Sequence, residues 1–545
     1  MGNLVSKQDH KEIENRRTFA IISHPDAGKT TLTEKLLLYG GAIAEAGMVK
    51  GKKNMRHAVS DWMEIEKQRG ISVTSSVMQF RYGEYCINIL DTPGHQDFSE
   101  DTYRTLMAAD SAVMVIDGSK GVEAQTRKLF KVCRMRGIPI FTFINKMDRE
   151  AKDSFELMSD IEGELGIETC PINWPIGSGK GFQGVYDRQR KELIKFSSEE
   201  SGESGSALGG SHAVQATKME LTDPALESIL GKEALEQLLE EIELLDGAGH
   251  ELDMEMVSRG ELSPVFFGSA LTNFGVEPFL RDFLQMTSSP LPRLSQAEEG
   301  DEMVDPFDNH FSGFIFKIQA NMNKAHRDRV AFMRICSGVF EKGMEVYHVQ
   351  EGKKIRLSQP TQLMAQDRSI VDKAWAGDII SVFDPGIFSI GDTLCDSNHK
   401  VIYQGIPTFA PEHFCRLRQV DTLKRKQFIK GTTQIAQEGA IQIFQEPGKG
   451  MEEVIVGVVG TLQFDVLQYR LNHEYNIEIR MEMLPYEHIR WIENKELDPH
   501  TLTLTSDTKI VQDFKGNYLL LFANEWNIDW AYQHNEGLVL SEFNR

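Results

Sequence analysis

The stretch Arg17-Thr-Phe-Ala-Ile-Ile-Ser23-His-Pro-Asp-Ala-Gly-Lys29-Thr30-Thr31 carries the strongest structural signal in this chain. The apolar run from Arg17 to Ile22 predicts a strand, and the residues from Lys29 to Tyr39 have the pattern of an amphipathic helix. Between them, the spacing of glycine, lysine and threonine fits a phosphate-binding loop in which Ser23 replaces the opening glycine. We therefore expect a strand, a phosphate-binding loop and a helix in direct succession.

This loop would place backbone N–H groups at a helix N-terminus, where the helix dipole favours anions. The N–H groups from Asp26 to Thr30 can cradle phosphates, and the ammonium group of Lys29 can reach the β- and γ-phosphates. The hydroxyl of Thr30 can bind Mg²⁺, whereas His24 is expected to contribute only packing or loop polarity. The candidate nucleotide-binding residues of the loop are Ser23, His24, Pro25, Asp26, Ala27, Gly28, Lys29, Thr30 and Thr31.

A second apolar strand, from Ile87 to Leu90, leads into a short polar motif. Its first residue, Asp91, is placed to hold Mg²⁺ through water, and Gly94 can offer its N–H to the γ-phosphate. Upstream, the hydroxyl of Ser72 would complete the metal site, with Thr74 as the alternative. The candidate nucleotide-binding residues of the motif are Asp91, Thr92, Pro93, Gly94 and His95, and the candidate magnesium ligands are Thr30, Ser72 and Asp91 through water.

The segment Asn145-Lys146-Met147-Asp148 selects the base. The Asp148 carboxylate can accept hydrogen bonds from N1–H and N2–H₂ of guanine, a pair that adenine does not offer. The stem of Lys146 can cover the ring face. Ser269-Ala270 would add a backbone N–H for guanine O6. The candidate base-binding residues are Asn145, Lys146, Asp148, Ser269 and Ala270, and the predicted ligands are GTP and GDP with Mg²⁺.

His95 is the candidate catalytic residue. Phosphoryl transfer to water needs the attacking water held in line with the scissile bond, and an imidazole beside Gly94 can orient it. No arginine can be assigned as an internal charge-stabilising finger, since Arg69 is matched by no pattern. We therefore expect slow turnover in isolation and stimulation by a partner.

Further strands, from Ala112 to Ile116 and from Ile138 to Ile144, alternate with helical stretches, and each motif follows the C-terminal end of a strand. This order predicts an α/β fold with a parallel sheet and ligand loops at one edge. The roughly 120 residues between Asp148 and Ser269 exceed one crossover connection and indicate an inserted α+β subdomain. The insertion contains a Gly/Ser/Glu tract (197–211), expected to be a mobile loop, and a helical pattern from Ala225 to Leu245.

Later segments change character. Short β-type runs punctuated by glycine predict a β-barrel, and the strand and helix patterns after it predict a C-terminal α+β domain with a tail that fits no pattern. The predicted domains are a GTP-binding domain at 1–290, with its insertion at about 150–265, a β-barrel domain at 305–400 and a C-terminal α+β domain at 401–545.

Composition indicates a reduced, cytoplasmic protein. Six widely spaced cysteines include no Cys-x-x-Cys pair, and the N-terminus lacks the apolar core of a signal peptide. A net charge of −22 argues against sequence-blind wrapping of nucleic acid. Two basic stretches remain candidates for local contacts with RNA, with a solvated charged face as the alternative. They are Lys324–Arg329 with Arg334, and Arg416–Arg418 with Lys424–Lys426 and Lys430.

At this point the motifs resemble a known family. Asp26–Thr31, Gln68–Ser72 and Asp91–Phe98 are similar to the corresponding segments of the translational GTPases. Longer stretches resemble one branch of them, the class II or GTPase release factors of bacterial-type ribosomes, and Ser23 and Ser72 agree with that branch's variant of the pattern. These stretches are Ser60–Gly70, Ser99–Thr105, Asn173–Gly179, Phe316–Met322, His326–Met333 and Gly460–Asp465.

The resemblance implies a ribosome-dependent GTPase that promotes departure of the class I release factor after peptide release. It implies the ribosome as partner, with a large-subunit rRNA loop activating His95, and ribosomal proteins and a class I release factor as further contacts. We expect a monomer that binds neither membrane nor DNA. The alternatives are a translocase-like ribosomal GTPase, whose family has two further domains, and a GTP-regulated binding scaffold that does not hydrolyse.

Overall fold

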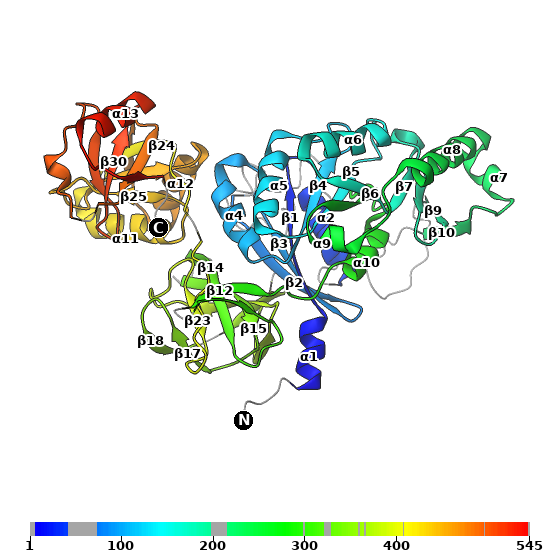
Figure 1. Ribbon diagram of the computed structural model, residues 1–545, viewed down its shortest axis with the longest axis horizontal. Helices are drawn as coiled ribbons and strands as arrows, with labels where there is room; N and C mark the ends of the chain where they lie inside the picture. The colour runs from blue at the N-terminus through cyan, green and yellow to red at the C-terminus, as the bar shows by residue number, and fades with distance from the viewer. Residues whose placement is uncertain are drawn as a thin grey trace.

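The computed structural model describes residues 6–41, 73–197, 215–297, 300–320, 329–357, 360–364, 367–406, 408–494 and 496–542. Figure 1 shows three lobes, with an α/β lobe joined to a β-rich lobe below it and to a mixed lobe at its side. We call them the N-terminal, middle and C-terminal lobes. They run from β1 (Arg16–Ser23) to α10 (Val276–Met286), from β14 (Ser312–Ala320) to β23 (Thr393–Cys395), and from β24 (His413–Gln419) to β31 (Leu540–Ser541).

The N-terminal lobe is built on a seven-stranded sheet with the order β2-β3-β1-β4-β5-β11-β6. Every neighbouring pair is parallel except β2 with β3. The predicted α/β fold with a parallel sheet is confirmed, and β2 adds an antiparallel edge. Besides β1, the strands are β2 (Ser76–Tyr82), β3 (Tyr85–Asp91), β4 (Ser111–Asp117), β5 (Ile140–Asn145), β6 (Glu168–Pro171) and β11 (Leu262–Phe267).

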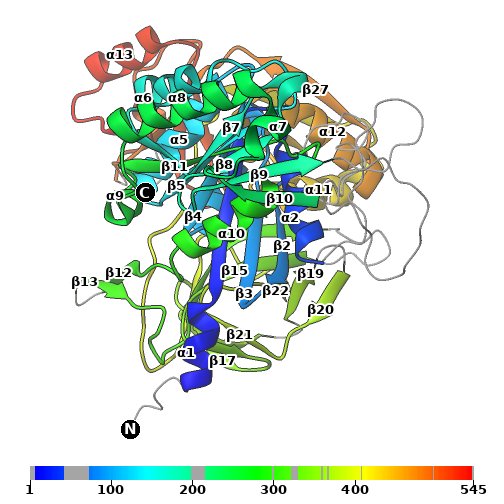
Figure 2. The same ribbon diagram turned by 90° about the vertical axis from the view of Figure 1, so that its right-hand side faces the viewer.

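Helices cover both faces of this sheet. Along β1, Phe19 and Ile21 belong to one apolar cluster whereas Ala20 and Ile22 belong to another, because successive strand side chains point to opposite faces. Helices α2 and α10 pack on the first face, and α5 and α6 pack on the second. Figure 2 shows these layers from the side. The remaining bounds are α2 (Lys29–Tyr39), α4 (Ser99–Met107), α5 (Ala124–Arg136) and α6 (Ser154–Leu165).

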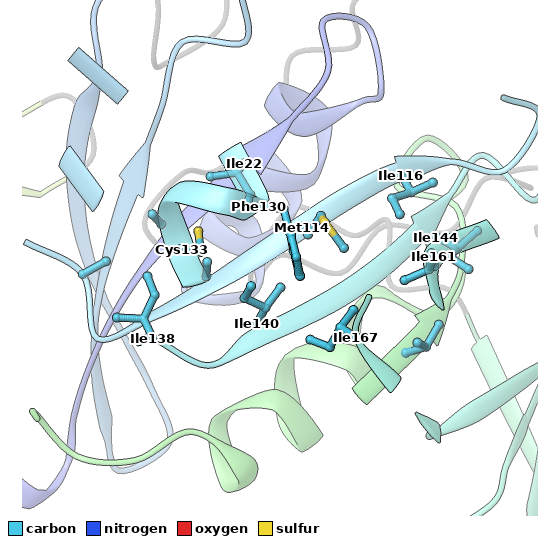
Figure 3. Packing of buried hydrophobic residues seen from close by; sticks show 14 of the residues in the cluster. Ile22, Met114, Ile116, Phe130, Cys133, Ile138, Ile140, Ile144, Ile161 and Ile167 are labelled. Carbon is cyan, nitrogen blue, oxygen red and sulfur yellow. The ribbon is translucent and has the colours of Figure 1, made fainter. Parts of the chain in front are cut away.

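Helix α5 illustrates how these residues form the core. Leu129, Phe130 and Cys133 lie on its buried face at helical spacing. Figure 3 shows Phe130 and Cys133 packed near Met114 of β4. Each such side chain contributes roughly 1.5–3 kcal/mol through burial. The helix ends at Gly137, whose φ of 63° is the left-handed conformation that a glycine adopts without strain.

The insertion forms its own antiparallel sheet, in the order β10-β9-β8-β7, followed by two helices. The single predicted helix from Ala225 to Leu245 is wrong in one respect, because Gly231, with φ of 88°, divides it in two. The predicted mobile tract falls almost entirely outside the described residues. The elements are β7 (Asn173–Ile176), β8 (Gly184–Asp187), β9 (Glu192–Ser197), β10 (Gln215–Glu220), α7 (Leu226–Leu230) and α8 (Lys232–Ala248).

The middle lobe is an antiparallel sheet with the order β18-β17-β23-β14-β15-β22-β19-β20, together with the pair β16 and β21. It encloses one apolar cluster to which β14, β15, β17 and β22 all contribute, as expected of a barrel. The remaining strands are β15 (Arg329–Ser337), β16 (Val339–Glu341), β17 (Glu345–His348), β18 (Lys353–Arg356), β19 (Thr361–Met364), β20 (Asp367–Ile370), β21 (Lys373–Trp375) and β22 (Ile379–Phe383).

The C-terminal lobe contains two four-stranded sheets, ordered β25-β26-β24-β27 and β29-β30-β28-β31. Helices α11 and α12 pack on the first, and α13 packs on the second, so the tail that fits no sequence pattern is a sheet with one helix. The bounds are α11 (Arg425–Gln437), β25 (Gln442–Phe444), β26 (Glu453–Val458), α12 (Leu462–Tyr475), β27 (Ile479–Leu484), β28 (His488–Ile492), β29 (Lys509–Gln512), β30 (Tyr518–Phe522) and α13 (Glu525–His534). In the described ranges, no helix combines the length and the apolar character that a membrane span requires.

Buried charges join the N-terminal and middle lobes. Arg334 of β15 is 1% exposed and its guanidinium lies 2.5 Å from the Asp110 carboxylate, and it also donates to the carbonyl of Ala108 at 3.1 Å. Arg16 pairs in the same way with Asp378 at 2.8 Å. The expectation that Arg334 contacts RNA is therefore wrong, because this side chain is enclosed between two lobes.

Arginines of the second basic stretch also carry acidic partners. Arg416 lies within 3.3 Å of carboxylates of Glu446, Glu453 and Glu482, and Arg418 lies 2.7 Å from Glu453. Such pairing reduces the charge available to phosphates. Lys426 and Lys430 are exposed and stay candidates for RNA contact, whereas residues 324–328 lie outside the described ranges.

Replacing Arg334 with alanine should leave Asp110 buried without its charge partner. Breaking a buried pair in this way costs about 3–5 kcal/mol, so thermal denaturation followed by circular dichroism should show a clearly lower midpoint. The matched control is Arg425→Ala, because the Arg425 pair with Glu452 is exposed on both sides (58% and 46%) and should contribute no more than about 1 kcal/mol. Equal midpoints for the two variants would contradict a stabilising role of the buried pair.

Candidate nucleotide-binding site

The phosphate-binding loop connects β1 to α2 at the C-terminal edge of the sheet. It uses two positive φ angles, 65° at Asp26 and 95° at Gly28, which turn the chain into the helix. A Cβ added at Gly28 would lie 2.2 Å from Nδ2 of Asn145, so only glycine fits there. The hydroxyl of Ser23 donates to the carbonyl of its neighbour His24 at 2.8 Å, which shows how a serine is accommodated at the opening position.

Lys29 and Asp91 form a buried ion pair in the middle of the site. Their exposed fractions are 6% and 2%, and the Lys29 ammonium donates to Oδ1 of Asp91. Two opposite charges in a poorly hydrated position stabilise each other, and either would be costly alone. These are the side chains expected to turn toward phosphate and metal. Thr30 follows at the first turn of α2, half-buried, as does Thr31.

The segment after β3 runs beside the phosphate-binding loop. Thr92 donates its hydroxyl to the carbonyl of Ile21 in β1 at 2.7 Å, which ties the two strand ends together. A Cβ placed on Gly94 would meet Pro25 Cα at 3.5 Å, an ordinary contact that shows how near the two loops are. Pro93 is buried between them. His95 comes next, and its side chain is 32% exposed.

Asn145 braces the loops on the base side. Its Nδ2 donates to the carbonyl of Ala27 at 2.9 Å, and its Oδ1 accepts from the N–H of Ala270 at 2.9 Å. One side chain thus fixes the phosphate loop against the loop after β11. Next to it, Ser269 donates its hydroxyl to Oδ1 of Asp148 at 2.6 Å, which orients the carboxylate expected to recognise guanine.

Lys146 and Asp117 form a second pair that sequence reasoning missed. Lys146 has a φ of 68°, and its ammonium donates to Oδ2 of Asp117 at 2.7 Å and to the carbonyl of Asp26. Although burial works against it, hydrogen bonds from Lys146 and Ser119 hold the pKa of Asp117 below its usual value. The sequence did contain a signal for this pair, because Asp117 ends β4 just as Asp91 ends β3, at the same edge of the sheet.

The remaining candidates are less central. His24 turns toward Glu123 at the start of α5, with 3.5 Å between Nε2 and Oε1, which agrees with a role in loop polarity. Ser72 lies outside the described residues, so its predicted contact with Mg²⁺ remains a prediction. Its alternative, Thr74, borders a cavity between the three lobes whose lining includes none of the nucleotide motifs.

Three family models match the chain in succession. They are the Elongation factor Tu GTP binding domain over residues 14–289, Elongation factor G domain 2 over residues 310–397, and the Class II release factor RF3, C-terminal domain, over residues 403–532. Together they place a nucleotide-binding domain, a barrel and a release-factor domain in the order that the structure shows.

Full-length relatives agree with these models. A curated protein named Peptide chain release factor 3 from Symbiobacterium thermophilum is 59% identical over 528 residues, which cover 97% of each chain. Another of that name, from Listeria monocytogenes serotype 4a, is 52% identical over 543 residues, covering 98% of this chain and 99% of that protein. A crystal structure of a Thermus thermophilus protein superposes with a TM-score of 0.67 at 21% identity, covering 89% of this chain and 71% of that one, and it shows similarity of fold alone.

Gly28→Ala should abolish tight binding of guanine nucleotides. Beyond the left-handed strain of about 1–2 kcal/mol, the added methyl would push Asn145 away from both loops it braces. We expect affinity for GDP, measured by isothermal titration calorimetry, to fall by at least about 100-fold, or about 2.7 kcal/mol. The matched control is Gly137→Ala, because Gly137 has a φ of 63° but no atom within 4 Å of the added Cβ. If both variants bound GDP equally well, the close approach of Gly28 to Asn145 would not be required for GDP binding.

Proposed function

The chain belongs to the peptide chain release factor 3 family, and from this premise we propose that it uses GTP hydrolysis to time the departure of a class I release factor from the ribosome. It is a translational GTPase that acts in termination. The proposal adds the step: in its GTP state the protein promotes dissociation of the class I factor after peptide release, and hydrolysis ends its own stay. Action on ribosomes would place it in the cytoplasm.

The reaction is attack of water on the γ-phosphorus of GTP, which yields GDP and phosphate. The phosphate loop would hold the phosphates through its N–H groups, and Lys29 would leave Asp91 to pair with the β- and γ-phosphates. His95, next to Gly94, would orient the water in line with the scissile bond. The position of this histidine, four residues after the buried Asp91 and directly after Gly94, where the segment passes close to the phosphate loop, is the single observation that carries the proposal of hydrolysis.

The residues present fit a magnesium ion. The buried Asp91 carboxylate is paired with Lys29, so when Lys29 moves to phosphate the carboxylate needs another cation. Thr30 supplies a hydroxyl, and carboxylate, hydroxyl and water oxygens are the ligands that Mg²⁺ prefers. Asp91, through water, Thr30 and, as a prediction, Ser72 would hold the ion. When bound, it would neutralise charge on the phosphate oxygens.

Two observations favour the release factor over the other candidate functions. Residues 403–532 match the C-terminal domain of class II release factors, and this match supports a release factor rather than a translocase. A non-hydrolysing scaffold would not need an oriented histidine beside Gly94. The class I factor and the ribosome are accordingly the proposed partners, with the ribosome's large-subunit rRNA loop proposed to activate His95.

His95→Ala should remove most of the ribosome-stimulated hydrolysis. A side chain positioned to hydrogen-bond the reacting water and take its proton contributes about 10²–10⁴-fold, so we expect turnover of GTP with ribosomes to fall by at least about 100-fold while affinity for GTP changes little. His250→Ala, in the insertion, is the matched control because its ring is 47% exposed and pairs only at the surface with Glu168.

The same preparations test the proposed step. A labelled class I release factor on terminated ribosomes should dissociate faster when wild-type protein and GTP are added. No acceleration would refute removal of that factor as the function. Full stimulated turnover by His95→Ala would refute only the role of His95.

Asp148→Asn should change the base that is recognised. The carboxylate accepts two hydrogen bonds from guanine, and an amide that presents an N–H₂ group instead opposes one of them. We expect GTP affinity to fall by about 100-fold or more, since a charged hydrogen bond is worth about 1.5–3 kcal/mol and a mismatched buried donor adds to the loss. Xanthosine triphosphate, which has a carbonyl in place of the 2-amino group, should bind better to the variant than GTP does. Competition binding of the two nucleotides measures this, and an unchanged preference would exclude Asp148 from base recognition.

A further inference from the structure

One carboxylate links His95 to the C-terminal lobe. Asp97 lies in the short 3-10 turn from Gln96 to Phe98, directly after His95, and is 7% exposed. Its Oδ1 lies 3.1 Å from Nδ1 of His95, and its Oδ2 accepts the backbone N–H of Leu462 at 2.8 Å. Leu462 begins α12, in a lobe that contributes nothing to the nucleotide motifs. Asp97 therefore contacts both the His95 ring and the C-terminal lobe.

Gly460 of the C-terminal lobe approaches Asp97 very closely. A Cβ added to Gly460 would lie 2.2 Å from Cγ of Asp97 and 2.5 Å from its Cα, so the approach requires glycine. The turn that presents Gly460 is held in place by Gln463, whose Oε1 accepts from the N–H groups of Val459 at 3.0 Å and Gly460 at 2.9 Å. Gln463 also donates to the carbonyl of Ala440 at 2.9 Å. The position of Asp97 is thus set by a rigid part of the other lobe.

An apolar cluster surrounds this contact. Val73 and Phe98 of the N-terminal lobe are buried against Val466 of α12, with Leu462 and Tyr469 packed beside them. Val73 is the first described residue after Ser72, and Phe98 follows Asp97. Helix α12 therefore contacts both segments expected to respond to the γ-phosphate, which is where a lobe would have to sit to sense or control that response.

The two polar contacts of the His95 ring have different chemical consequences. Nδ1 also lies 3.3 Å from the N–H of Asp97, as an acceptor. In a neutral ring, Nδ1 either carries a proton that the Asp97 carboxylate accepts or accepts from this N–H, but not both. With the proton on Nδ1, Nε2 is free to accept from a water. In the other tautomer, Nε2 donates. A neighbouring carboxylate selects the first form.

We propose that Asp97 is a positioning residue through which the C-terminal lobe sets the tautomer and orientation of His95. The inference rests on the proposed function, since it assigns His95 to the water. While the lobe holds Asp97 in place, Nδ1 is the protonated nitrogen and Nε2 presents a lone pair. When the lobe shifts relative to the N-terminal lobe, the Leu462 bond and the Gly460 contact are lost, and His95 loses the group that orients it. Hydrolysis is thereby made dependent on the arrangement of the lobes.

Two substitutions in the full-length protein test this from opposite sides. Asp97→Asn keeps the size and an oxygen for the Leu462 N–H, but its amide can donate to Nδ1 and select the other tautomer. Gly460→Ala leaves the amino-acid sequence of the N-terminal lobe unchanged but displaces Asp97 by steric contact. Gly405→Ala is the matched control, because no atom lies within 4 Å of its added Cβ and its φ is not positive.

With ribosomes, we expect both test variants to lower kcat for GTP hydrolysis by about 10-fold or more, as loss of tautomer control does in hydrolytic triads. The KM for ribosomes and the affinity for GTP should stay within about two-fold of wild type, and Gly405→Ala should behave as wild type. In ¹⁵N spectra of histidine-labelled protein in alkaline buffer, the His95 signal, assigned by its absence from His95→Ala, should change from the Nδ1–H to the Nε2–H form in Asp97→Asn.

Several results would overturn the inference. One is an unchanged kcat in both Asp97→Asn and Gly460→Ala while His95→Ala is inactive, a pattern that leaves the proposed function intact. A second is a change confined to thermal stability or to the KM for ribosomes, which would indicate a structural role only. A third is an unchanged His95 tautomer in Asp97→Asn. If wild-type protein itself were not stimulated by ribosomes, or if His95→Ala kept full turnover, the assignment of His95 would fail and this inference with it.

Discussion

The segments on both sides of the γ-phosphate motif are held against the middle lobe by one buried ammonium group, that of Lys317 in β14. Lys317 is 5% exposed, and it donates to the hydroxyl of Ser75 at 2.9 Å and lies 3.4 Å from the carboxylate of Asp101 at the start of α4. Asp101 in turn accepts the N–H of Ser75 at 2.6 Å. Despite burial, Lys317 and these hydrogen bonds keep the pKa of Asp101 low. One charge of the middle lobe thus contacts Ser75, before the γ-phosphate motif, and Asp101, after it. Without this charge the buried Asp101 carboxylate would lose its ammonium partner.

The junction around this charge combines paired charges with the apolar cluster of Val73, Phe98 and Val466. Arg104 of α4 donates to the carbonyl of Gly439 at 3.1 Å, and Arg470 of α12 lies between Glu438 and Glu474 at 3.0 and 2.8 Å. Arg104, Glu438 and Arg470 line the cavity between the lobes. An apolar interface loses its whole hydrophobic contribution on separation, whereas paired charges regain hydration when they part. Charge pairs of this kind favour one arrangement and cost less to separate than an apolar interface, as the proposed response of the lobes to nucleotide requires.

The parts of the structure that the sequence could predict are those set by local patterns. Apolar runs of Arg17–Ile22 and Ala112–Ile116 became strands because strand alternation and the motifs at their ends are readable over a few residues. The division of a helix at Gly231 and the burial of Arg334 could not be predicted in this way. The first required the conformation of one glycine, and the second depended on Asp110, which lies 224 residues away.

The same limit applied inside the site. The residues expected to touch nucleotide are at the predicted sheet edge, but the sequence did not reveal what joins them. Asn145 reads as a base-binding residue, yet its side chain is hydrogen-bonded to Ala27 and Ala270, which places its role in bracing two loops. Asp97 reads as an ordinary acidic residue in a loop. Its proposed role follows from its contacts with Gly460 and Leu462, and no local pattern can report a contact with another lobe.

These interactions imply that, under the proposed function, nucleotide binding would exchange charge partners. The two lysines of the site, Lys29 and Lys146, are paired with Asp91 and Asp117, so neither carboxylate is left alone in a poorly hydrated position. If phosphates drew Lys29 away, Asp91 would need another cation. Asp91 is the last residue of β3, and Thr92, directly after it, donates its hydroxyl to the carbonyl of Ile21 in β1. The carboxylate paired with Lys29 and the histidine proposed to orient the water therefore lie on one short segment, from Asp91 to His95.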